Sequence, residues 1–288
     1  MILVFGQSGQ VASELQSFED IFALNRSMAD LRNPERCSDI IRDYKPAAVI
    51  NAAAYTAVDK AEKEEALATI INGDAPSQMA KACADLAIPF VHISTDYVFD
   101  GTKDSPYVET DPVNPIAVYA KSKEAGERAL RERLERHIIL RTSWVFGVLG
   151  NNFVKTMVRL AKDRDRLTVV ADQFGGPSSA RGIAEALLTI AAKYQSGASI
   201  AWGTYHYCQK PYVSWHQFAE MIVAHAIEVG LVDHAVEVAP IPSSEFPTPV
   251  ARPLNSRLDP SELQAIFPLI EIPNWSDDLS DVIKATFE

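Results

Sequence analysis

The sequence has few cysteines, a deficit of basic residues and no long hydrophobic run. Its three cysteines, Cys37, Cys83 and Cys208, are too widely spaced to form a disulfide framework or a metal-ligand pattern, so we expect no metal centre. The 38 acidic residues outnumber the 27 lysines and arginines, for a formal charge of −11. This balance argues against nucleic acid as the main partner, because phosphate binding needs a basic surface.

Segments that cross or target a membrane are also missing from the pattern. No apolar run approaches the roughly 20 residues needed to span a bilayer. The apolar stretch at 1–5 is too short for a signal-peptide core, and Gly6 follows it at once. We therefore expect a cytoplasmic protein with no membrane partner.

What is present is an alternation of short apolar runs with helix-compatible segments. The apolar runs, which read as strands, lie at 1–5, 21–25, 47–51, 88–94 and 137–146. Nearly continuous apolar runs of this length suit parallel strands covered on both faces. The pattern predicts an α/β fold with a doubly wound, Rossmann-like parallel sheet, whose ligand crevice lies at the carboxyl ends of the strands.

The rhythm loosens after about residue 147, which indicates a second and smaller unit. Residues 1–147 are expected to form a dinucleotide-binding domain, and residues 148–288 mainly a C-terminal substrate-binding lobe. Eight of the 17 prolines lie beyond residue 238, as expected for loops wrapped around a small lobe. Part of the second half, at about 165–195, is expected to return to the first domain, with the strand 167–170 joining its sheet.

A glycine-containing loop follows the first strand directly. In "VFGQSGQVA", Gly6, Gly9 and Ala12 lie between a strand and a helix, where a bare backbone can approach a pyrophosphate. A plain strand-to-helix turn is the alternative. The second strand then ends in Asn25, Arg26 and Ser27, with no acid to bind a ribose 2′-hydroxyl. Because the Arg26 guanidinium can pair with a 2′-phosphate, NADPH is favoured over NADH, unless Arg26 is only a solvated surface residue.

Polar side chains also follow the third and fourth strands. Thr56 offers a hydroxyl behind the small residues at 52–54, and "STDYVF" ends the fourth strand with Thr95, Asp96 and Tyr97. These positions lie where the crevice should be, although polar strand-end caps are also common. Asp30 could reach an adenine amino group or simply be solvated.

Tyr119 and Lys123 lie four residues apart in "AVYAKSKEAGE", a segment typical of a helix. That spacing stacks both side chains on one helix face. A neighbouring ammonium lowers the pKa of a phenol, so the pair is suited to acid–base chemistry at a carbonyl. Gly126 beside the pair leaves room for close packing.

These motifs together resemble the dTDP-4-dehydrorhamnose reductase family, a group of extended short-chain dehydrogenases/reductases. The resemblance rests on "GQSGQVA", "NAAAYTAVDKAE", "STDYVFDG", "YAKSKEAGE", "RTSWVFG" and "PTPVARPLNSRLD". It implies NADPH-dependent reduction of the 4-keto group of dTDP-4-dehydro-β-L-rhamnose, the last step of dTDP-L-rhamnose synthesis. The rhamnose would then serve carbohydrate synthesis, for example of lipopolysaccharide.

The resemblance also implies roles for single residues. Tyr119 would donate a proton to the carbonyl oxygen, Lys123 would lower the Tyr119 pKa and bind the nicotinamide ribose, and Thr95 would hydrogen-bond the reacting oxygen. The cofactor would lie against Gly9, Gln10, Val11, Asp30, Leu31, Ala54, Tyr55 and Thr56. The sugar would touch Asp96 and Trp144, with Tyr97 beside them. Arg252 is proposed for the nucleotide diphosphate on charge alone.

Two departures from the family pattern bear on cofactor and assembly. Some members carry an acid where Asn25 stands, which again favours NADPH. Some dimerise around Mg²⁺ through glutamates; this chain keeps Glu14 but has Arg181 where a second glutamate is expected, so we expect no metal-bridged dimer, and a homodimer of another kind stays open.

Other functions of the same fold remain as alternatives. Nucleotide-sugar dehydratases usually place an Asp-Glu pair after the threonine, and here Tyr97 follows Asp96. An epimerase is less easily set aside. A regulatory subunit that binds cofactor without turnover is disfavoured by the intact Thr95, Tyr119 and Lys123.

Overall fold

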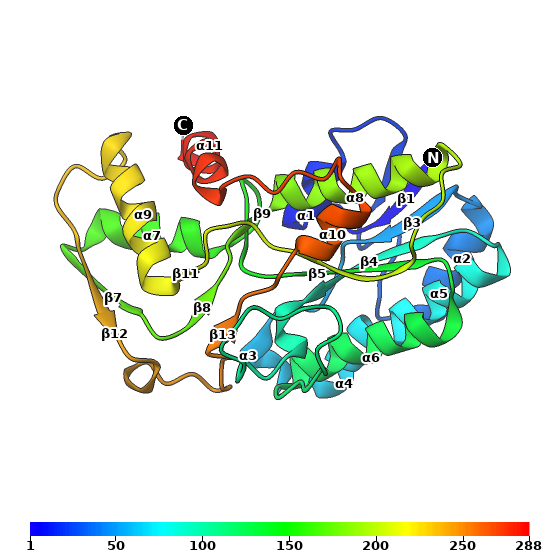
Figure 1. Cartoon of the computed structure of the whole chain (residues 1–288), viewed down its shortest axis with the longest axis horizontal. Helices are drawn as coiled ribbons and strands as arrows, with labels where there is room; N and C mark the ends of the chain where they lie inside the picture. The colour runs from blue at the N-terminus through cyan, green and yellow to red at the C-terminus, as the bar shows by residue number, and fades with distance from the viewer. Residues whose placement is uncertain (288) are drawn as a thin grey trace.

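A six-stranded parallel sheet forms the centre of the computed structural model, which describes residues 1–287 (Figure 1). The strands are β1 (Ile2–Phe5), β2 (Ile21–Leu24), β3 (Ala48–Asn51), β4 (Phe90–Thr95), β5 (His137–Thr142) and β10 (Gly203–Tyr207). Their order is β10-β5-β4-β3-β1-β2, so the chain winds outward in both directions from the neighbours β1 and β3. The expected doubly wound sheet is confirmed, and its carboxyl edge between these two strands is the usual ligand crevice.

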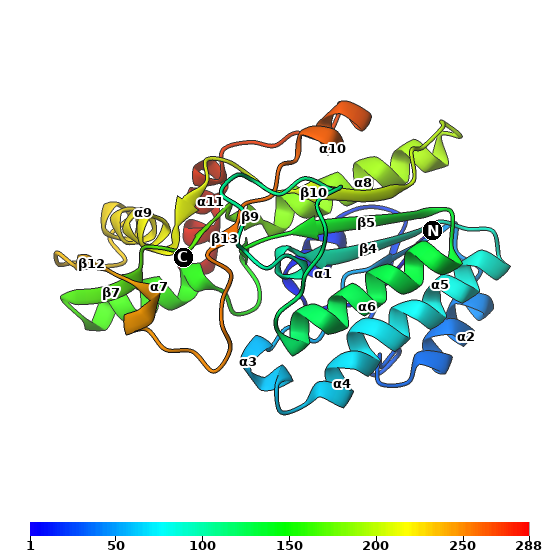
Figure 2. The same cartoon turned by 60° about the horizontal axis from the view of Figure 1, so that its bottom comes forward.

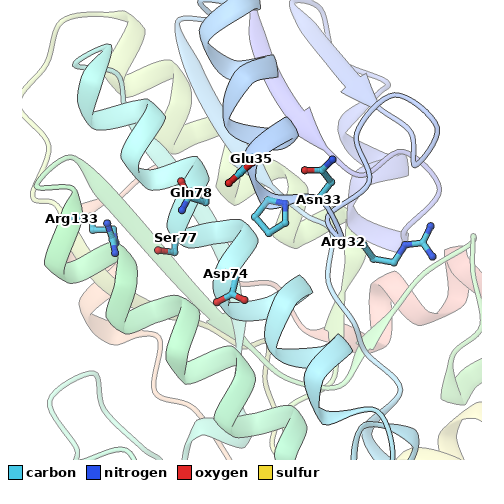
Figure 3. A pocket seen from close by; sticks show the side chains of 8 residues that line it. Arg32, Asn33, Glu35, Asp74, Ser77, Gln78 and Arg133 are labelled. Atoms are coloured by element: carbon cyan, nitrogen blue, oxygen red, sulfur yellow. The ribbon is translucent and has the colours of Figure 1, made fainter.

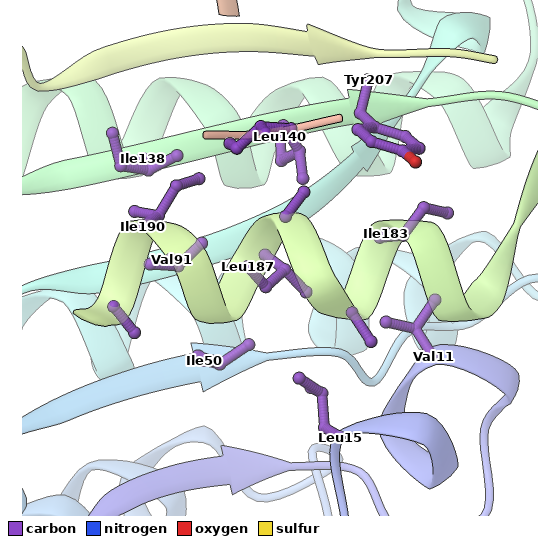
Figure 4. Packing of buried hydrophobic residues seen from close by; sticks show 14 of the residues in the cluster. Val11, Leu15, Ile50, Val91, Ile138, Leu140, Ile183, Leu187, Ile190 and Tyr207 are labelled. Carbon is purple, nitrogen blue, oxygen red and sulfur yellow. The ribbon is translucent and has the colours of Figure 1, made fainter. Parts of the chain in front are cut away.

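One face of the sheet is covered by apolar packing. Helices α1 (Gln10–Leu15), α8 (Ala180–Gln195) and α10 (Ser261–Ile266) lie on it. Figure 4 shows Ile183, Leu187 and Ile190 of α8 over side chains of the strands, among them Ile50 and Val91. These side chains are buried in one continuous cluster, so this face is held by the hydrophobic effect.

The opposite face is covered by α2 (Pro34–Tyr44), α5 (Ala75–Asp85) and α6 (Val118–Arg133), which run side by side (Figure 2). Asn33 caps α2 by accepting a hydrogen bond from the Arg36 amide at 3.1 Å. Before α5 come α3 (Val58–Ala61), α4 (Glu65–Thr69) and a π-helical turn, η1 (Ile70–Asp74). Helix α6 contacts α3, α4, η1, α5 and β4, so it is fixed from several sides.

The second half builds a smaller lobe around its own core. This lobe contains α7 (Phe153–Asp163), β7 (Arg166–Val170), α9 (Trp215–Glu228), β12 (Glu237–Ile241) and α11 (Trp275–Phe287). The expected return of the strand 167–170 to the main sheet is wrong, because β7 pairs in parallel with β12 instead. Helix α8 does lie on the main sheet, and β10 is the strand that extends it.

Short strands connect the lobe to the main sheet. β6 (Val145–Phe146) pairs with β9 (Ser178–Ser179), and β8 (Phe174–Gly175) lies between β11 (Val213–Ser214) and β13 (Asn255–Ser256). Two 3₁₀ turns, η2 (Asp96–Val98) and η3 (Ser243–Glu245), complete the elements. In the part of the chain that the structure describes, no helix is both long and apolar enough to cross a membrane.

Candidate functional site

Tyr119 and Lys123 lie in the first two turns of α6, at the carboxyl edge of the sheet. Glu62 accepts a hydrogen bond from the Val118 amide at 2.9 Å and so fixes the start of the helix. Both side chains are buried, Tyr119 with 8% and Lys123 with 2% of its surface exposed. The Tyr97 ring meets the Tyr119 ring edge-on, with 5.8 Å between centroids. The predicted pair is therefore rigidly held and shielded from bulk water.

Burial raises the pKa of the Tyr119 phenol, and a hydrogen bond with the Thr95 side chain only partly opposes this effect. The negative charge of Asp96 raises the pKa further. The direction differs from the expectation that Lys123 lowers it, because burial outweighs the other effects and the Lys123 Nζ donates to the Ile93 carbonyl at 2.7 Å, not to the phenol. Tyr119 consequently remains protonated at neutral pH, which is the form that a proton donor requires.

Thr95 and Asp96 end β4 next to this pair. The Thr95 hydroxyl donates to the Asp96 carboxylate at 3.0 Å and accepts from the Tyr97 amide at 3.2 Å. Burial raises the pKa of Asp96 to about 6, although hydrogen bonds from Ser256 and Thr95 act against it. Ser256 belongs to β13, so Asp96 joins the main sheet to the C-terminal segment.

Arg252 reaches the same region from the loop before β13. Its Nη2 donates to Asp59 at 2.6 Å, and its charge and a hydrogen bond act on the Tyr97 hydroxyl. Its Nη1 is buried with no hydrogen-bond partner among residues 1–287. An unpaired guanidinium nitrogen beside the site fits the predicted contact with an anionic group.

The glycine loop approaches the third strand closely. Gly6 has φ +109°, and a Cβ there would lie 3.3 Å from the Ala52 carbonyl carbon and the Ala53 nitrogen. Gly9 precedes α1 as its N-cap, without a side-chain cap on the helix amides. Gln10 accepts from Asn152 at 2.9 Å, whereas Val11 is buried in the apolar core. The loop backbone thus packs closely against the end of β3, and its predicted contact with a pyrophosphate stays a prediction.

Charged residues cluster after β2. Arg26 lies 3.5 Å from Asp30, and Arg32 binds the same carboxylate with Nε at 2.8 Å. The hydrogen bond from Arg32 is the main reason why the Asp30 pKa falls to about 2. Asp30 is therefore already paired, Leu31 is buried, and two guanidiniums rather than one gather after β2.

The segment after β3 is tied down by a residue that the sequence analysis missed. Asn72 of η1 accepts from the Tyr55 amide at 2.8 Å and donates to the Tyr55 carbonyl at 3.0 Å. The Tyr55 hydroxyl donates to Glu64 at 2.8 Å. The neighbours Ala54 and Thr56 are exposed, so they can meet a ligand.

Trp144 lies in the connection between β5 and β6, in a left-handed backbone conformation with φ +48°. Its indole stacks on Trp215, with 3.5 Å between centroids, and a Cβ on Gly175 would come within 2.5 Å of it. Gly175 has no side chain, so the Trp144 indole can lie directly against its backbone. This contact and the stacking on Trp215 fix the indole at the edge of the lobe.

Beneath α6 lies a set of buried polar residues that sequence reasoning also missed. Glu127 forms a buried ion pair with Arg141, and His92 lies against Lys123 at 3.2 Å between Nε2 and Nζ. The sequence feature that could have revealed them is a charged or imidazole side chain inside an otherwise apolar strand, as in "FVHIS" and "IILRT". Such residues need buried partners, but the sequence does not say which ones.

A separate pocket of about 450 Å³ lies between α2, α5 and the end of α6 (Figure 3). Arg32, Asp74 and Arg133 are among its lining residues, and none of the catalytic candidates is.

Arg181 of α8 lies near enough to Glu14 of α1 to act on the Glu14 pKa. Within residues 1–287, no group of three or more His, Cys, Asp or Glu residues could hold a metal ion.

Comparisons with known proteins identify the family of the chain. The model of the RmlD substrate binding domain matches residues 1–287. A dTDP-4-dehydrorhamnose reductase of Burkholderia thailandensis is 45% identical over 283 residues, covering 95% of each chain. The Salmonella typhimurium reductase is 40% identical and covers 99% of this chain and 98% of its own.

Solved structures of the same kind also superpose well. A reductase from Clostridium acetobutylicum has a TM-score of 0.90 at 35% identity, and one from Bacillus anthracis in complex with NADP has 0.88 at 33%, each covering 98% of both chains. A dTDP-glucose 4,6-dehydratase at 16% identity shares the fold alone. The chain belongs to the dTDP-4-dehydrorhamnose reductase family, an oxidoreductase family of extended short-chain dehydrogenase/reductase fold.

Proposed function

We propose that this protein reduces the 4-keto group of dTDP-4-dehydro-β-L-rhamnose with NADPH, which yields dTDP-L-rhamnose. The main support is one observation: Thr95 and Tyr119 lie together at the carboxyl edge of a Rossmann-like sheet, with Lys123 one helical turn along α6, in a chain with reductase relatives over almost its whole length. The product is a sugar donor, so the reaction belongs to carbohydrate synthesis.

Tyr119 is the proposed proton donor. Its buried, protonated phenol gives its proton to the carbonyl oxygen while that oxygen accepts a hydrogen bond from the Thr95 hydroxyl. A bound reduced nicotinamide supplies the hydride to C4. The positive charge of Lys123, which lies one helical turn away and is hydrogen-bonded to the Ile93 carbonyl and not to the phenol, is proposed to stabilise the phenolate left on Tyr119 at longer range. The phenolate then takes up a proton from solvent.

The cofactor-binding surface is proposed to run along the ends of β1, β2 and β3. Gly6 and Gly9 let the backbone approach a pyrophosphate, with Gln10 and Val11 in the first turn of α1. Asp30 and Leu31 lie beside the adenine, and Ala54, Tyr55 and Thr56 beside the nicotinamide half. The close approach at Gly6, which a Cβ would obstruct, fits such a ligand.

A preference for NADPH over NADH is proposed from the cations after β2. Arg26 and Arg32 both pair with Asp30, but both side chains are largely exposed. Both guanidiniums can therefore turn towards a 2′-phosphate. Arg26→Ala should raise the KM for NADPH several-fold more than the KM for NADH, since the 2′-phosphate is the only difference between them. Equal increases would contradict this role.

The sugar nucleotide is proposed to lie between the main sheet and the C-terminal lobe. Asp96 and Tyr97 would contact the sugar, the Trp144 indole would cover its apolar side, and the free Nη1 of Arg252 would bind the diphosphate. This division gives residues 1–147 to cofactor and residues 148–288 mainly to substrate, with α8 and β10 returning to the sheet.

The cellular compartment and the oligomeric state are proposed in general terms. The three cysteines are free and buried, which suits a reducing compartment such as the cytoplasm. If the chain forms a homodimer, we propose that it does so without a bridging metal, because Arg181 already lies beside Glu14.

The deciding experiment follows NADPH absorbance at 340 nm while the keto sugar is generated by the upstream dehydratase and epimerase. Consumption that needs both upstream enzymes supports the function. Tyr119→Phe should then lower kcat by about 10²–10⁴-fold with little change in cofactor binding. Cofactor binding without consumption by the wild-type protein would contradict the function and favour a regulatory subunit.

A further inference from the structure

His92 is a fully buried imidazole in the middle of β4, and its ring reaches Lys123 of α6. Helix α6 lies along this strand (Figure 2). Both ring nitrogens have partners. Nδ1 lies 3.2 Å from the Asn51 side-chain nitrogen, and Nε2 lies 3.2 Å from Lys123 Nζ. A buried imidazole with two polar partners is a defined hydrogen-bonding group, not a filler of the core.

The orientation of Asn51 decides where the imidazole carries its proton. The Asn51 side-chain oxygen accepts a hydrogen bond from the Ala53 amide at 3.1 Å, so the amide nitrogen must be the atom that faces His92. That nitrogen can only donate, and Nδ1 must accept. His92 is therefore the neutral tautomer with its hydrogen on Nε2, in line with burial and Lys123 lowering its pKa well below the usual value.

The hydrogen on Nε2 points at Lys123. An ammonium group has no lone pair to accept it, whereas a neutral amine has one. A donor placed against Nζ thus favours the neutral form, as burial also does by lowering the Lys123 pKa to about 8. The Ile93 carbonyl, at 2.7 Å, accepts a hydrogen bond from either form.

Other charged groups face the same position from α6 and β5. Glu127, one turn further along α6, favours a charged Lys123. Its carboxylate is paired with Arg141 of β5 at 2.7 Å and with Arg131 at 2.9 Å, so much of its charge is already balanced. Gly126 adds no side chain between helix and strand; a Cβ there would lie 3.7 Å from His92 Nε2.

We propose that His92, oriented by Asn51, is a positioning residue for Lys123: it holds the amine against β4 and favours its uncharged form. This inference rests on the proposed roles of Tyr119 and Lys123. Because the charge of Lys123 stabilises the phenolate that Tyr119 leaves behind, the reaction slows as Lys123 loses its proton. His92 then sets the upper pH limit of catalysis without touching substrate or cofactor.

The first test compares His92→Gln with His206→Gln in pH profiles of kcat. The glutamine carbonyl oxygen can accept a hydrogen bond from a Lys123 ammonium, so the falling limb should move up by about one pH unit. His206 is an equally buried imidazole on β10 whose ring contacts Arg141 and the Tyr107 carbonyl, and its replacement should leave the limb in place. A limb that stays in place in both variants, or shifts equally in both, would overturn the proposal.

A second test needs neither turnover nor a variant that folds well. In wild-type protein labelled with ¹⁵N-histidine, the His92 resonances should show a protonated Nε2 and a bare Nδ1 between about pH 6 and pH 9. A hydrogen on Nδ1, or titration like that of a free histidine, would refute the proposal. A wild-type protein that shows the expected tautomer but never oxidises NADPH with the keto sugar would instead contradict the proposed function.

Discussion

The two faces of the central sheet are built from the same strands and are both largely apolar, but they differ where β4 and β5 meet the covering helices. Alternate residues of β4 and β5 point to opposite sides, so Val91 and Leu140 enter the apolar cluster under α8, and His92 and Arg141 face α6. The first face is packed hydrocarbon. The second is also apolar under α2 and α5, but beside α6 it carries buried charges and amides that need partners, so it is the polar face of the sheet and the one that carries Tyr119 and Lys123. Both faces therefore stabilise the sheet, but only the polar face places charged groups next to Tyr119 and Lys123.

The largest expected effect comes from breaking the buried ion pair on the polar face. Glu127→Ala leaves the Arg141 guanidinium buried without its main partner, so the free energy of unfolding should fall by about 3–5 kcal/mol. Urea unfolding followed by circular dichroism measures this loss. Glu185→Ala, which removes an exposed partner of Arg181, is the matched control and should change stability by no more than about 0.5 kcal/mol. Similar losses in the two variants would mean that burial adds nothing to the pair.

A comparable loss of stability is expected on the apolar face, but with a different result for catalysis. Leu187 is fully buried in the cluster under α8, so Leu187→Ala should lower the free energy of unfolding by about 2–5 kcal/mol. Well below the unfolding temperature, its pH profile of kcat should match that of the wild type. A shifted profile would show that the two faces are coupled through the strands.

A smaller effect is expected where α6 meets η1. A Cβ on Gly126 would lie 2.2 Å from the Asn72 carbonyl oxygen, so Gly126→Ala forces the helix away and should cost about 1–3 kcal/mol, with a fall in kcat. Gly73→Ala adds a methyl group on the facing segment, 3.4 Å from Ala125 Cβ, and should be nearly neutral. Thermal unfolding and kcat measured for both variants test this difference. If Gly126→Ala changed neither stability nor kcat, α6 would be loosely held.

An effect of similar size, but of opposite sign and dependent on pH, is expected from Asp96. Burial raises its pKa to about 6, above that of an unfolded chain, so the folded protein binds the extra proton between about pH 4 and 6. Stability should therefore fall as pH rises through this window. Asp96→Asn should remove that slope and raise the free energy of unfolding at pH 7 by about 1–3 kcal/mol. An unchanged slope would assign the pH dependence to other groups.

The apolar face and the glycine loop could be predicted from the sequence, because both follow from local patterns. Runs such as "AAVIN" fix a buried strand, and Gly6 directly after the first strand marks a close backbone approach. The spacing of Tyr119 and Lys123 likewise needs only one helix. These features depend on neighbours along the chain.

The polar face could not be predicted, because each contact joins segments far apart in sequence. His92 and Lys123 are 31 positions apart, and Asp96 meets Ser256 across most of the chain. The pairing of β7 with β12 was missed for the same reason: "LTVV" predicts a strand but not its partner. Arg32 was missed because its role depends on how the loop folds around Asp30.

The alternation of β5 has a consequence for how the sheet is assembled. If β5 paired with β4 one residue out of step, Arg141 would enter the hydrocarbon beneath α8, among residues such as Leu187 and Ile183, far from Glu127. An unpaired charge in such surroundings costs several kcal/mol. The buried pair of Arg141 with Glu127 therefore disfavours an out-of-step pairing of β5 with β4 and helps to define the register of the sheet.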